Sequence, residues 1–422
     1  MHLLAFPAFD SVTTIFRNTR LYKNQLKIVG LQHMSTFTTT SRIIVTCNKR
    51  LGPYLAAEVE ELGYKVVRSF TSGVELAGTL EDCIVLNLKL RCASQVLFSL
   101  KSFFAVNADD LYKKLVKFPW NKFIASDGYF SITSNVHHPS ILKDSFANLR
   151  VKDAIVDQMR ASGGERPNSG AELKGLVFHL YWNEAGAELF IDTSGETLAK
   201  HGYRKFPGDA PMLEALAAAI IRASNWNRKT PFINPMCGSG TIAIEAALLA
   251  TNRYPGLLRS NYSFMHIKGY QAAFYQKQLH ALQAAITPLS SPLIEAGDIS
   301  EEAVRIAKIN AAAAGVAEAI HFEQCDFAAT KVVADGAGVI YFNPEYGERL
   351  GDATALIETY RGIGDFMKKN GGGYTGYVFT GNLELAKQIG LKPRYRMEFY
   401  TSTMDSRLLV FELYSGTKRA PK

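Results

Sequence analysis

The chain has 422 residues, which is enough for two or three domains of about 150 residues each. Its hydrophobic content of 47% is ample for buried cores. A formal net charge of +8 favours an anionic partner such as a nucleic acid, although many basic proteins bind none.

Two further classes of protein are excluded by pattern. No apolar run approaches the roughly 20 residues that span a bilayer, so no membrane partner is predicted. The five cysteines are widely spaced and contain no CxxC pair, which argues against a disulfide framework and a zinc site. We therefore expect a reduced, cytoplasmic protein that needs no metal.

Residues 1–40 differ in composition from the rest of the chain. Their cations outnumber a single acid, Asp10, and serines and threonines are frequent. This composition is typical of a transit peptide, but we favour a flexible N-terminal extension. Met34 would make a sensible start of its own.

From Ser41 to residue 205 the pattern predicts a compact α+β region. Strands are expected over 42–47, 65–70, 74–78, within 93–105 and over 128–136, with a β-hairpin over 176–195. Helices are expected over 51–64, 81–90, 107–124 and 146–164. The third of these helices begins after Asn107, a good N-cap, and lysines gather near its end, where they complement the helix dipole or contact phosphates.

The sequence pattern over residues 206–422 predicts an α/β domain. A helix over 211–226 is expected to begin at Pro211, a favoured first residue. Residues 251–285 form an insertion that mixes aromatic and cationic residues, which suits RNA stacking and plain packing almost equally. Beyond residue 350, the pattern predicts helices over 353–369 and from Asn382, and strands over 374–381, 395–402 and 407–414.

The most informative stretch is 231–250, PFINPMCGSGTIAIEAALLA. A short apolar run, a glycine turn at Gly238 and Gly240, and a long Ala-rich segment predict a strand, a tight turn and a helix. Glycines let the backbone approach a ligand, and the helix N-terminus offers unpaired N–H groups, so a nucleotide-like ligand fits there. No Lys-Ser/Thr pair follows, which argues against a P-loop.

Three more strands follow, each ending in polar residues. LIEAGDIS (293–300) reads as a strand ending in Asp298, and HFEQCDF (321–327) as one ending in Asp326. GVIYFNPEYGERL (338–350) reads as a strand ending in Asn343-Pro344-Glu345-Tyr346. Strands separated by helical segments predict a doubly wound parallel sheet, whose ligands lie outside the carboxyl ends of the strands.

The series NPMCGSGTIAIEAA, GDIS, CDF and NPEYGERL resembles class I S-adenosylmethionine-dependent methyltransferases. More narrowly, it resembles the RNA guanine-N2 methyltransferases that carry an N-terminal THUMP domain. The resemblance covers residues 41–415 and implies a Rossmann-like catalytic domain with S-adenosylmethionine as cofactor. The residues it implies as cofactor contacts are Asn234, Pro235, Cys237, Gly238, Gly240, Asp298, Asp326 and Phe327. Asn234 departs from the Asp that is common in this family.

The NPEY motif is the expected catalytic centre. The Asn343 side-chain oxygen and the Pro344 carbonyl would each accept one N–H of the target amine, while Tyr346 stacks on the flipped base. The remaining contribution is positioning, because the sulfonium leaving group is already activated. Glu345 stands where the family usually has a second proline, and it could contact guanine N1–H, which puts the choice of base in doubt.

The resemblance also extends to residues 146–204, which are similar to the C-terminal half of a THUMP domain, an RNA-gripping module. Expected substrate contacts are Glu345 and Arg349 near the base, and Arg150, Lys152, Arg204 and Lys205 on the RNA backbone. We expect methylation of a guanine in 23S rRNA, by a single methyltransferase unit. The alternatives are a tRNA guanine-N2 methyltransferase and a non-catalytic RNA-binding or ribosome-assembly factor.

Overall fold

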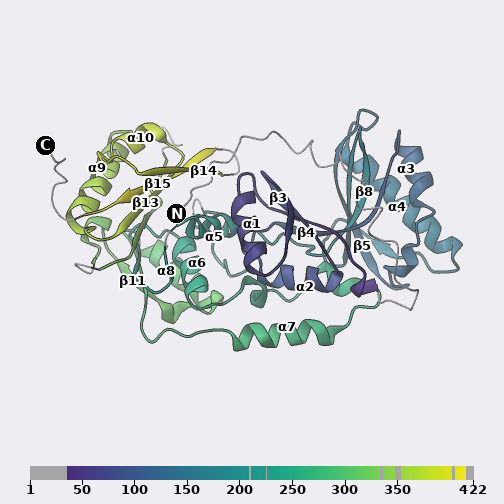
Figure 1. The fold of residues 1–422 in the computed structure, drawn as a ribbon, viewed down its shortest axis with the longest axis horizontal. Helices are drawn as coiled ribbons and strands as arrows, with labels where there is room; N and C mark the ends of the chain where they lie inside the picture. Colours follow the sequence, from purple (N-terminus) through teal and green to yellow (C-terminus); the bar gives the residue numbers. More distant parts are fainter. Residues whose placement is uncertain are drawn as a thin grey trace. The chain divides into compact units, whose positions relative to one another are not determined.

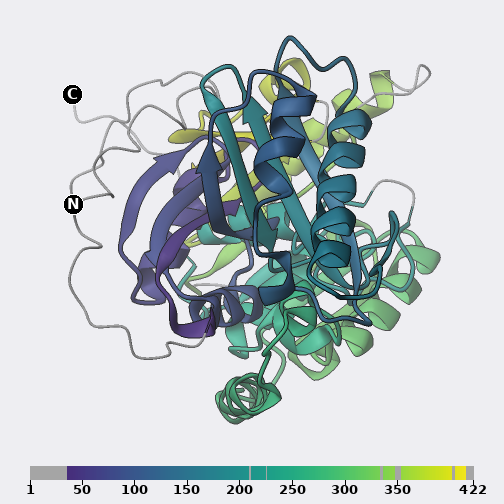
Figure 2. The same ribbon diagram turned by 90° about the vertical axis from the view of Figure 1, so that its right-hand side faces the viewer.

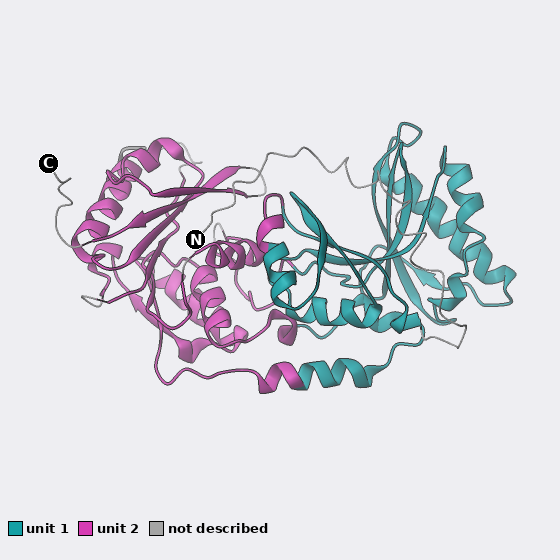
Figure 3. Ribbon diagram, in the orientation of Figure 1, with its two compact units in different colours: residues 1–48, 55–198, 259–280 teal, residues 49–54, 199–258, 281–422 magenta. Residues whose placement is uncertain are grey.

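The computed structural model describes residues 36–208, 211–224, 226–332, 336–346, 353–401 and 404–414 (Figure 1). They divide into two compact units that interleave along the chain (Figure 3). The first unit is drawn from the residues up to Asn48, from Leu55–Leu198 and from Arg259–His280. The second is drawn from Lys49–Tyr54, Ala199–Leu258 and the residues from Ala281 onward. The expected division at residues 40 and 205 remains a proposal.

The first unit contains an eight-stranded sheet of order β2-β3-β1-β4-β8-β7-β5-β6. Its strands are β1 (Ser41–Thr46), β2 (Val66–Phe70), β3 (Gly73–Gly78), β4 (Gln95–Phe103), β5 (Tyr129–His137), β6 (Asn168–Ser169), β7 (Leu176–Asn183) and β8 (Gly186–Asp192). Its helices include α2 (Leu80–Lys89), α3 (Ala108–Leu115) and α4 (Asp144–Ala161), with α1 (Gly52–Glu61) spanning the division. α3 packs against α4, and α4 packs against β5 (Figures 1 and 2).

The strands, helices and hairpin predicted for this region are confirmed, with one correction to a boundary. Asn107 caps α3, as expected, by accepting from the N–H of Asp110 at 2.9 Å. The helix ends at Leu115 and does not continue to residue 124, because Pro119 disfavours helical backbone at the residue before it. A separate 3₁₀ turn, Trp120–Lys122, follows.

The second unit contains a seven-stranded sheet of order β11-β10-β9-β12-β13-β15-β14. Its strands are β9 (Phe232–Asn234), β10 (Ile294–Asp298), β11 (Ile320–Gln324), β12 (Val339–Phe342), β13 (Thr375–Thr380), β14 (Tyr395–Tyr400) and β15 (Asp405–Glu412). Its helices are α5 (Glu214–Arg222), α6 (Thr241–Ala250), α8 (Glu301–Ala314), α9 (Ala353–Asn370) and α10 (Leu383–Lys387). The first five strands in this order pair in parallel, and β15 inserts antiparallel between β13 and β14, so the predicted Rossmann-like class is confirmed.

The central strands of this sheet are buried on both faces. Every residue of β9 and β12 is buried, as expected for strands covered by helices on each side. Ile340 and Phe342 of β12 pack with Phe366 and Met367 of α9 in one apolar cluster. Burying such a side chain is worth about 1.5–3 kcal/mol, so this core holds the end of β12 in place.

In the second half of the chain, one expected boundary needs correction, and one of two open alternatives is favoured. α5 begins at Glu214, three residues after Pro211, because Leu213 keeps an extended backbone and serves as the N-cap. In the segment 251–285, Tyr262 and Phe264 are fully buried and stack on each other at 4.9 Å, so packing explains them better than RNA stacking. α7 (Ala272–Ala284) follows these two residues.

None of the described helices is both long and apolar enough to cross a membrane.

Candidate active site

The carboxyl ends of the parallel strands carry the polar residues that the sequence singled out. Asn234 is the last residue of β9, Asp298 is the last of β10, and Asn343 follows directly after β12. Neighbouring parallel strands end at the same edge of a sheet, so these side chains share the edge where ligands of such sheets bind. Asp326 was predicted to end its strand. β11 instead ends at Gln324, so Asp326 lies two residues beyond the strand.

The glycine turn after β9 is open on one side. Gly238 and Gly240 have φ angles of +52° and +87°, which other residues rarely adopt. A Cβ atom on Gly240 would lie 2.9 Å from the Cβ of Ala307, so this glycine lets α6 approach α8. A Cβ atom on Gly238 would meet nothing within 4 Å. The turn therefore leaves room for a ligand at Gly238 while Gly240 secures the packing behind it.

Asp298 joins this turn to the neighbouring strand. Its Oδ2 accepts from the N–H of Gly238 at 2.9 Å, and its Oδ1 accepts from the N–H of Ser300 at 3.0 Å. Each carboxylate oxygen keeps accepting capacity, so the group can also bind a vicinal diol. The next residue, Ile299, is 69% exposed and offers an apolar surface beside the carboxylate. Sequence reasoning missed Ile299, because an isoleucine at a strand end has the pattern of a core residue.

Asp326 and Phe327 differ in how far their side chains are exposed. Asp326 is exposed, and its Oδ1 caps a short 3₁₀ turn by accepting from Ala328 N–H at 2.8 Å. The ring of Phe327 packs edge-on against Phe342 and Phe366, with ring centres 6.1 and 6.5 Å apart. The partly buried ring of Phe327 thus packs against the core, and the expected cofactor contact would come from its backbone.

Three of the expected cofactor contacts, Asn234, Pro235 and Cys237, are buried where β9 leads into the turn. Asn234 donates from Nδ2 to the carbonyl of Tyr341 at 3.0 Å, which ties β9 to the strand that carries the NPEY motif. Its Oδ1 is buried and has no hydrogen-bond partner among the described residues. Pro235 is also buried. Burial, with a smaller effect from the Asp298 charge, raises the pKa of the Cys237 thiol well above its usual value, so the thiol stays neutral.

The NPEY motif is held by hydrogen bonds on both sides. The hydroxyl of Tyr346 donates to Asn343 Oδ1 at 2.7 Å, which marks the oxygen end of that amide as the acceptor. The carbonyl of Tyr346 accepts from Asn382 Nδ2 at 3.1 Å. The carbonyl of Glu345 accepts from the hydroxyl of Tyr360, a fully buried side chain, at 3.2 Å. The motif is thus anchored to α9 and to the loop after β13.

A cavity of about 590 Å³ lies beside this motif. It is lined by Tyr346, Gly381, Asn382, Leu383, Glu384, Met404, Asp405 and Arg407. Tyr346, Leu383 and Met404 supply apolar side chains, and Leu383 is 46% exposed. Three of the polar side chains are already in ion pairs: Asp405 with Arg50 at 2.7 Å, Glu384 with Lys387 at 2.7 Å and Arg407 with Glu398 at 3.5 Å. The cavity suits a flat, partly apolar group such as a nucleic-acid base.

The expected RNA contacts in the first unit form part of a second cavity. This cavity, about 470 Å³, is lined by Tyr112, Arg150, Lys152, Asp153, Val156, Asp157, Arg160 and Arg166. Arg150 is largely engaged within the unit, since it pairs with Asp109 at 2.8 Å and lies over the ring of Tyr112. Lys152, Arg160 and Arg166 therefore contribute the more available cations.

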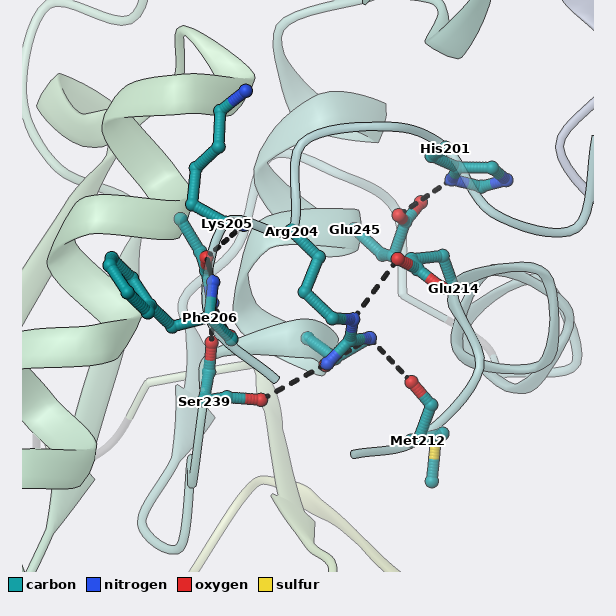
Figure 4. Close-up of polar contacts among 10 residues, drawn as sticks. His201, Arg204, Lys205, Phe206, Met212, Glu214, Ser239 and Glu245 are labelled. Atoms are coloured by element: carbon teal, nitrogen blue, oxygen red, sulfur yellow. Dashed lines mark hydrogen bonds and ion pairs between the residues drawn. The ribbon is translucent and has the colours of Figure 1, made fainter. Parts of the chain in front are cut away.

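Among the remaining predicted contacts, Arg204 requires a correction. Its guanidinium donates to Glu214, Ser239, Met212 and Thr241 within the second unit, and its side chain is only 14% exposed (Figure 4). These contacts explain Arg204 as a structural residue and not as an RNA-backbone contact. Lys205 is exposed and remains a candidate. Glu345 is exposed beside the motif, while Arg349 lies outside the described residues.

Three family descriptions match successive parts of the chain. They are the RlmL ferredoxin-like domain over residues 42–97, the THUMP domain over 105–183 and the RMKL-like methyltransferase domain over 201–408. Over 381 residues, the chain is 31% identical to a Synechocystis sp. protein provisionally named an RNA methyltransferase, slr0064, covering 90% of this chain and 99% of that protein. The chain belongs to the THUMP-containing, RlmL-like methyltransferase family. The predicted resemblance is thereby confirmed.

Other members of the RlmL-like family show the same relationship. The chain is 33% identical to the ribosomal RNA large subunit methyltransferase K/L of Syntrophotalea carbinolica, over 88% of this chain and 53% of that protein. It thus spans about half the length of this relative. A solved structure of SMU.472, provisionally named a methyltransferase and determined in complex with SAH, matches 90% of this chain and 99% of that one. The two share 25% identity with a TM-score of 0.80.

Proposed function

We propose that this chain transfers a methyl group from S-adenosylmethionine to the exocyclic N2 of a guanine in 23S rRNA. The observation that carries the proposal is the hydrogen bond from Tyr346 to Asn343 Oδ1 at the end of β12. It presents an oriented amide oxygen beside a cavity of suitable size for a base. The relatives that are named ribosomal RNA large subunit methyltransferases support the choice of RNA.

The glycine turn and the strand ends fit the proposed cofactor. Gly238 leaves open space above the turn, and the unpaired Oδ1 of buried Asn234 is available to a donor. The carboxylate of Asp298 would accept from the ribose hydroxyls, and the exposed carboxylate of Asp326 from the adenine amine. Ile299 would cover one face of the adenine with apolar surface. When bound, S-adenosylmethionine supplies a methyl group that is already activated by the sulfonium.

The chain's own residues would prepare the amine. Its lone pair is delocalised into the guanine ring, so the nitrogen is a poor nucleophile until it becomes more tetrahedral. Asn343 Oδ1 and the Pro344 carbonyl would each accept one N–H and so direct the lone pair out of the ring plane. The Tyr346 hydroxyl keeps the amide oxygen on the substrate side, because it already donates to that oxygen. The apolar walls at Leu383 and Met404 would hold the flipped base and exclude water.

The THUMP-bearing unit would bind the RNA outside the target nucleotide. Lys152, Arg160 and Arg166 line one cavity of this unit and would contact phosphates without reading sequence. Lys205 in the second unit would add a further contact. A cytoplasmic location agrees with an rRNA substrate and with five free thiols.

The test is methyl transfer to separated RNAs. The protein is incubated with labelled S-adenosylmethionine and with 23S rRNA, 16S rRNA or tRNA from cells lacking the gene. The proposal expects label in 23S rRNA, and none when Asn343→Ala replaces the wild type. Label in tRNA alone would favour the tRNA guanine-N2 methyltransferase. Cofactor binding without transfer to any RNA would favour a non-catalytic RNA-binding or assembly factor.

A further inference from the structure

A polar network ties the segment 203–208 to the glycine turn (Figure 4). Its two hubs are Arg204 in this segment and Asn310 on α8, which lie far apart in the sequence. Both bridge from the segment to Ser239, the middle residue of the turn. All the residues involved belong to the second unit.

Arg204 reaches the turn and the first residue of α6 together. Its Nη1 donates to Ser239 Oγ at 3.2 Å, and its Nη2 donates to Thr241 Oγ1 at 3.0 Å. Its Nε donates to the carboxylate of Glu214 at 3.1 Å, and Nη2 also donates to the carbonyl of Met212 at 2.6 Å. Four of the five guanidinium N–H groups thus have a partner, in the planar fork that only arginine offers.

Asn310 uses its full hydrogen-bonding capacity in the same place. Its Oδ1 accepts from the backbone N–H groups of Lys205 and Phe206 at 2.8 and 3.2 Å. Its Nδ2 donates to the carbonyls of Phe206 and Ser239 at 3.0 and 3.1 Å. The residue is 1% exposed, so no water competes for these groups. A primary amide has two donors and two accepting positions, and all four are satisfied here.

A third polar tie lies one turn further along α6. His201 Nδ1 and Glu245 Oε1 are 2.7 Å apart, and both side chains are fully buried. The segment also passes close to the turn, because a Cβ atom placed on Gly208 would lie 3.4 Å from Ser239 Cβ. The segment therefore follows the turn over several residues.

The glycine turn needs such support for a physical reason. Glycine loses more conformational freedom on ordering than any other residue. The N-cap of α6 is Gly240, which provides no side-chain cap. If the turn were disordered before binding, the ligand would have to offset this entropy, and its affinity would fall. The contacts from Arg204 to the hydroxyls of Ser239 and Thr241, and from Asn310 to the carbonyl of Ser239, order the turn in advance.

We propose that Arg204 and Asn310 are positioning residues that hold the glycine turn in its cofactor-binding shape. This inference rests on the proposed function, since it assumes that S-adenosylmethionine binds at the turn. Neither side chain need touch the cofactor. Their loss weakens cofactor binding while the methyl-transfer step at Asn343 keeps its machinery.

The experiment measures SAH binding by calorimetry for Asn310→Asp and Arg204→Lys in the full-length chain. Aspartate keeps the two accepting positions of Asn310 but replaces its donors with a charge facing two carbonyls. Lysine keeps the charge of Arg204 but cannot form the planar fork. The matched controls are Asn87→Asp and Arg42→Lys. Asn87 is equally buried and bonds to Thr193 at 2.8 Å, and Arg42 pairs with Glu188, both in the first unit.

The proposal expects the Kd for SAH to rise about tenfold or more in both positioning variants, equivalent to 1.4 kcal/mol. The controls should stay within about twofold while lowering Tm comparably. In turnover assays, KM for S-adenosylmethionine should rise and kcat at saturation should change less. If Asn310→Asp does not fold, Ser239→Ala, which removes one acceptor of Arg204 on the turn, is expected to raise Kd about threefold.

Two results would overturn the positioning role. One is an SAH affinity equal to that of the wild type in both Asn310→Asp and Arg204→Lys. If Asn310→Asp does not fold, the same result in Ser239→Ala counts in its place. The other is an equal loss of affinity in the control variants, which would mean that general destabilisation explains the effect. A wild-type protein that folds but binds no SAH would be a different failure, since it would overturn the proposed function itself.

Discussion

Replacing Tyr346 with phenylalanine isolates the hydroxyl that orients the catalytic amide. The ring remains, so stacking on a base and the edge-on contact with Phe379, at 6.3 Å between ring centres, are retained. The hydrogen bond to Asn343 Oδ1 is lost. Without it, the amide can rotate and present its NH₂ group to the target amine, which also carries donors.

The size of the effect follows from this one contact. The 2.7 Å separation is ordinary for a good O–H···O hydrogen bond. Its net worth is about 1 kcal/mol, which corresponds to a roughly fivefold decrease in kcat. We expect kcat to fall by at most about tenfold, because a rotated Asn343 amide would also repel the N–H donors of the substrate. The KM for RNA should change little, since the stacking surface is intact.

The assay is the initial rate of methyl transfer at saturating S-adenosylmethionine with varied RNA. Tyr395→Phe, on the exposed side of β14, is the control and should retain wild-type kcat. Tyr346→Ala should also lose RNA affinity, because base stacking on an aromatic ring is worth about 1–3 kcal/mol. An unchanged kcat in Tyr346→Phe would refute the orienting role. An increased kcat would mean that the hydroxyl occupies the place of the target amine.

Three further outcomes are expected. Asp298→Asn places a donor against the N–H of Gly238 and should raise the Kd for SAH about tenfold, measured by calorimetry. Burial raises the pKa of Asp192 from 3.8 to about 7, so between these pH values the folded state binds more protons than the unfolded state. The contribution of Asp192 to stability therefore falls as the pH rises from about 4 to about 7. The Tm deficit of Asp192→Asn relative to wild type should therefore shrink with rising pH, and a constant deficit would contradict this. Combined alanine substitution of Lys152, Arg160 and Arg166 should weaken RNA binding and lower the salt dependence of log Kd by about 0.7 per lost phosphate contact.

Much of the second unit could be predicted because its signals are local. The glycine turn, the acid at the end of β10 and the NPEY motif each combine a strand, a turn and a polar residue within a few positions. The parallel sheet then brings them to one edge without further information. The same holds for Asn107, whose cap depends only on the next three residues.

The errors arose where a side chain's partner lies far along the chain. Arg204 was expected to contact RNA because the local sequence does not reveal whether an arginine is exposed or buried. Its partner Ser239 is 35 residues away. Asn310 was not singled out, since one asparagine in an alanine-rich helix carries no signal, yet it is bonded to Lys205, 105 residues away. Ile299 was missed because its exposure depends on where β10 ends.

The most direct test of the account identifies the methylated nucleoside. RNA from cells lacking the gene is treated with the protein and S-adenosylmethionine, digested to nucleosides, and analysed by mass spectrometry against standards. The account predicts new N2-methylguanosine in 23S rRNA that is absent with Asn343→Ala. New N6-methyladenosine, or guanosine methylated at an atom other than the exocyclic N2, would contradict the assignment of the target amine.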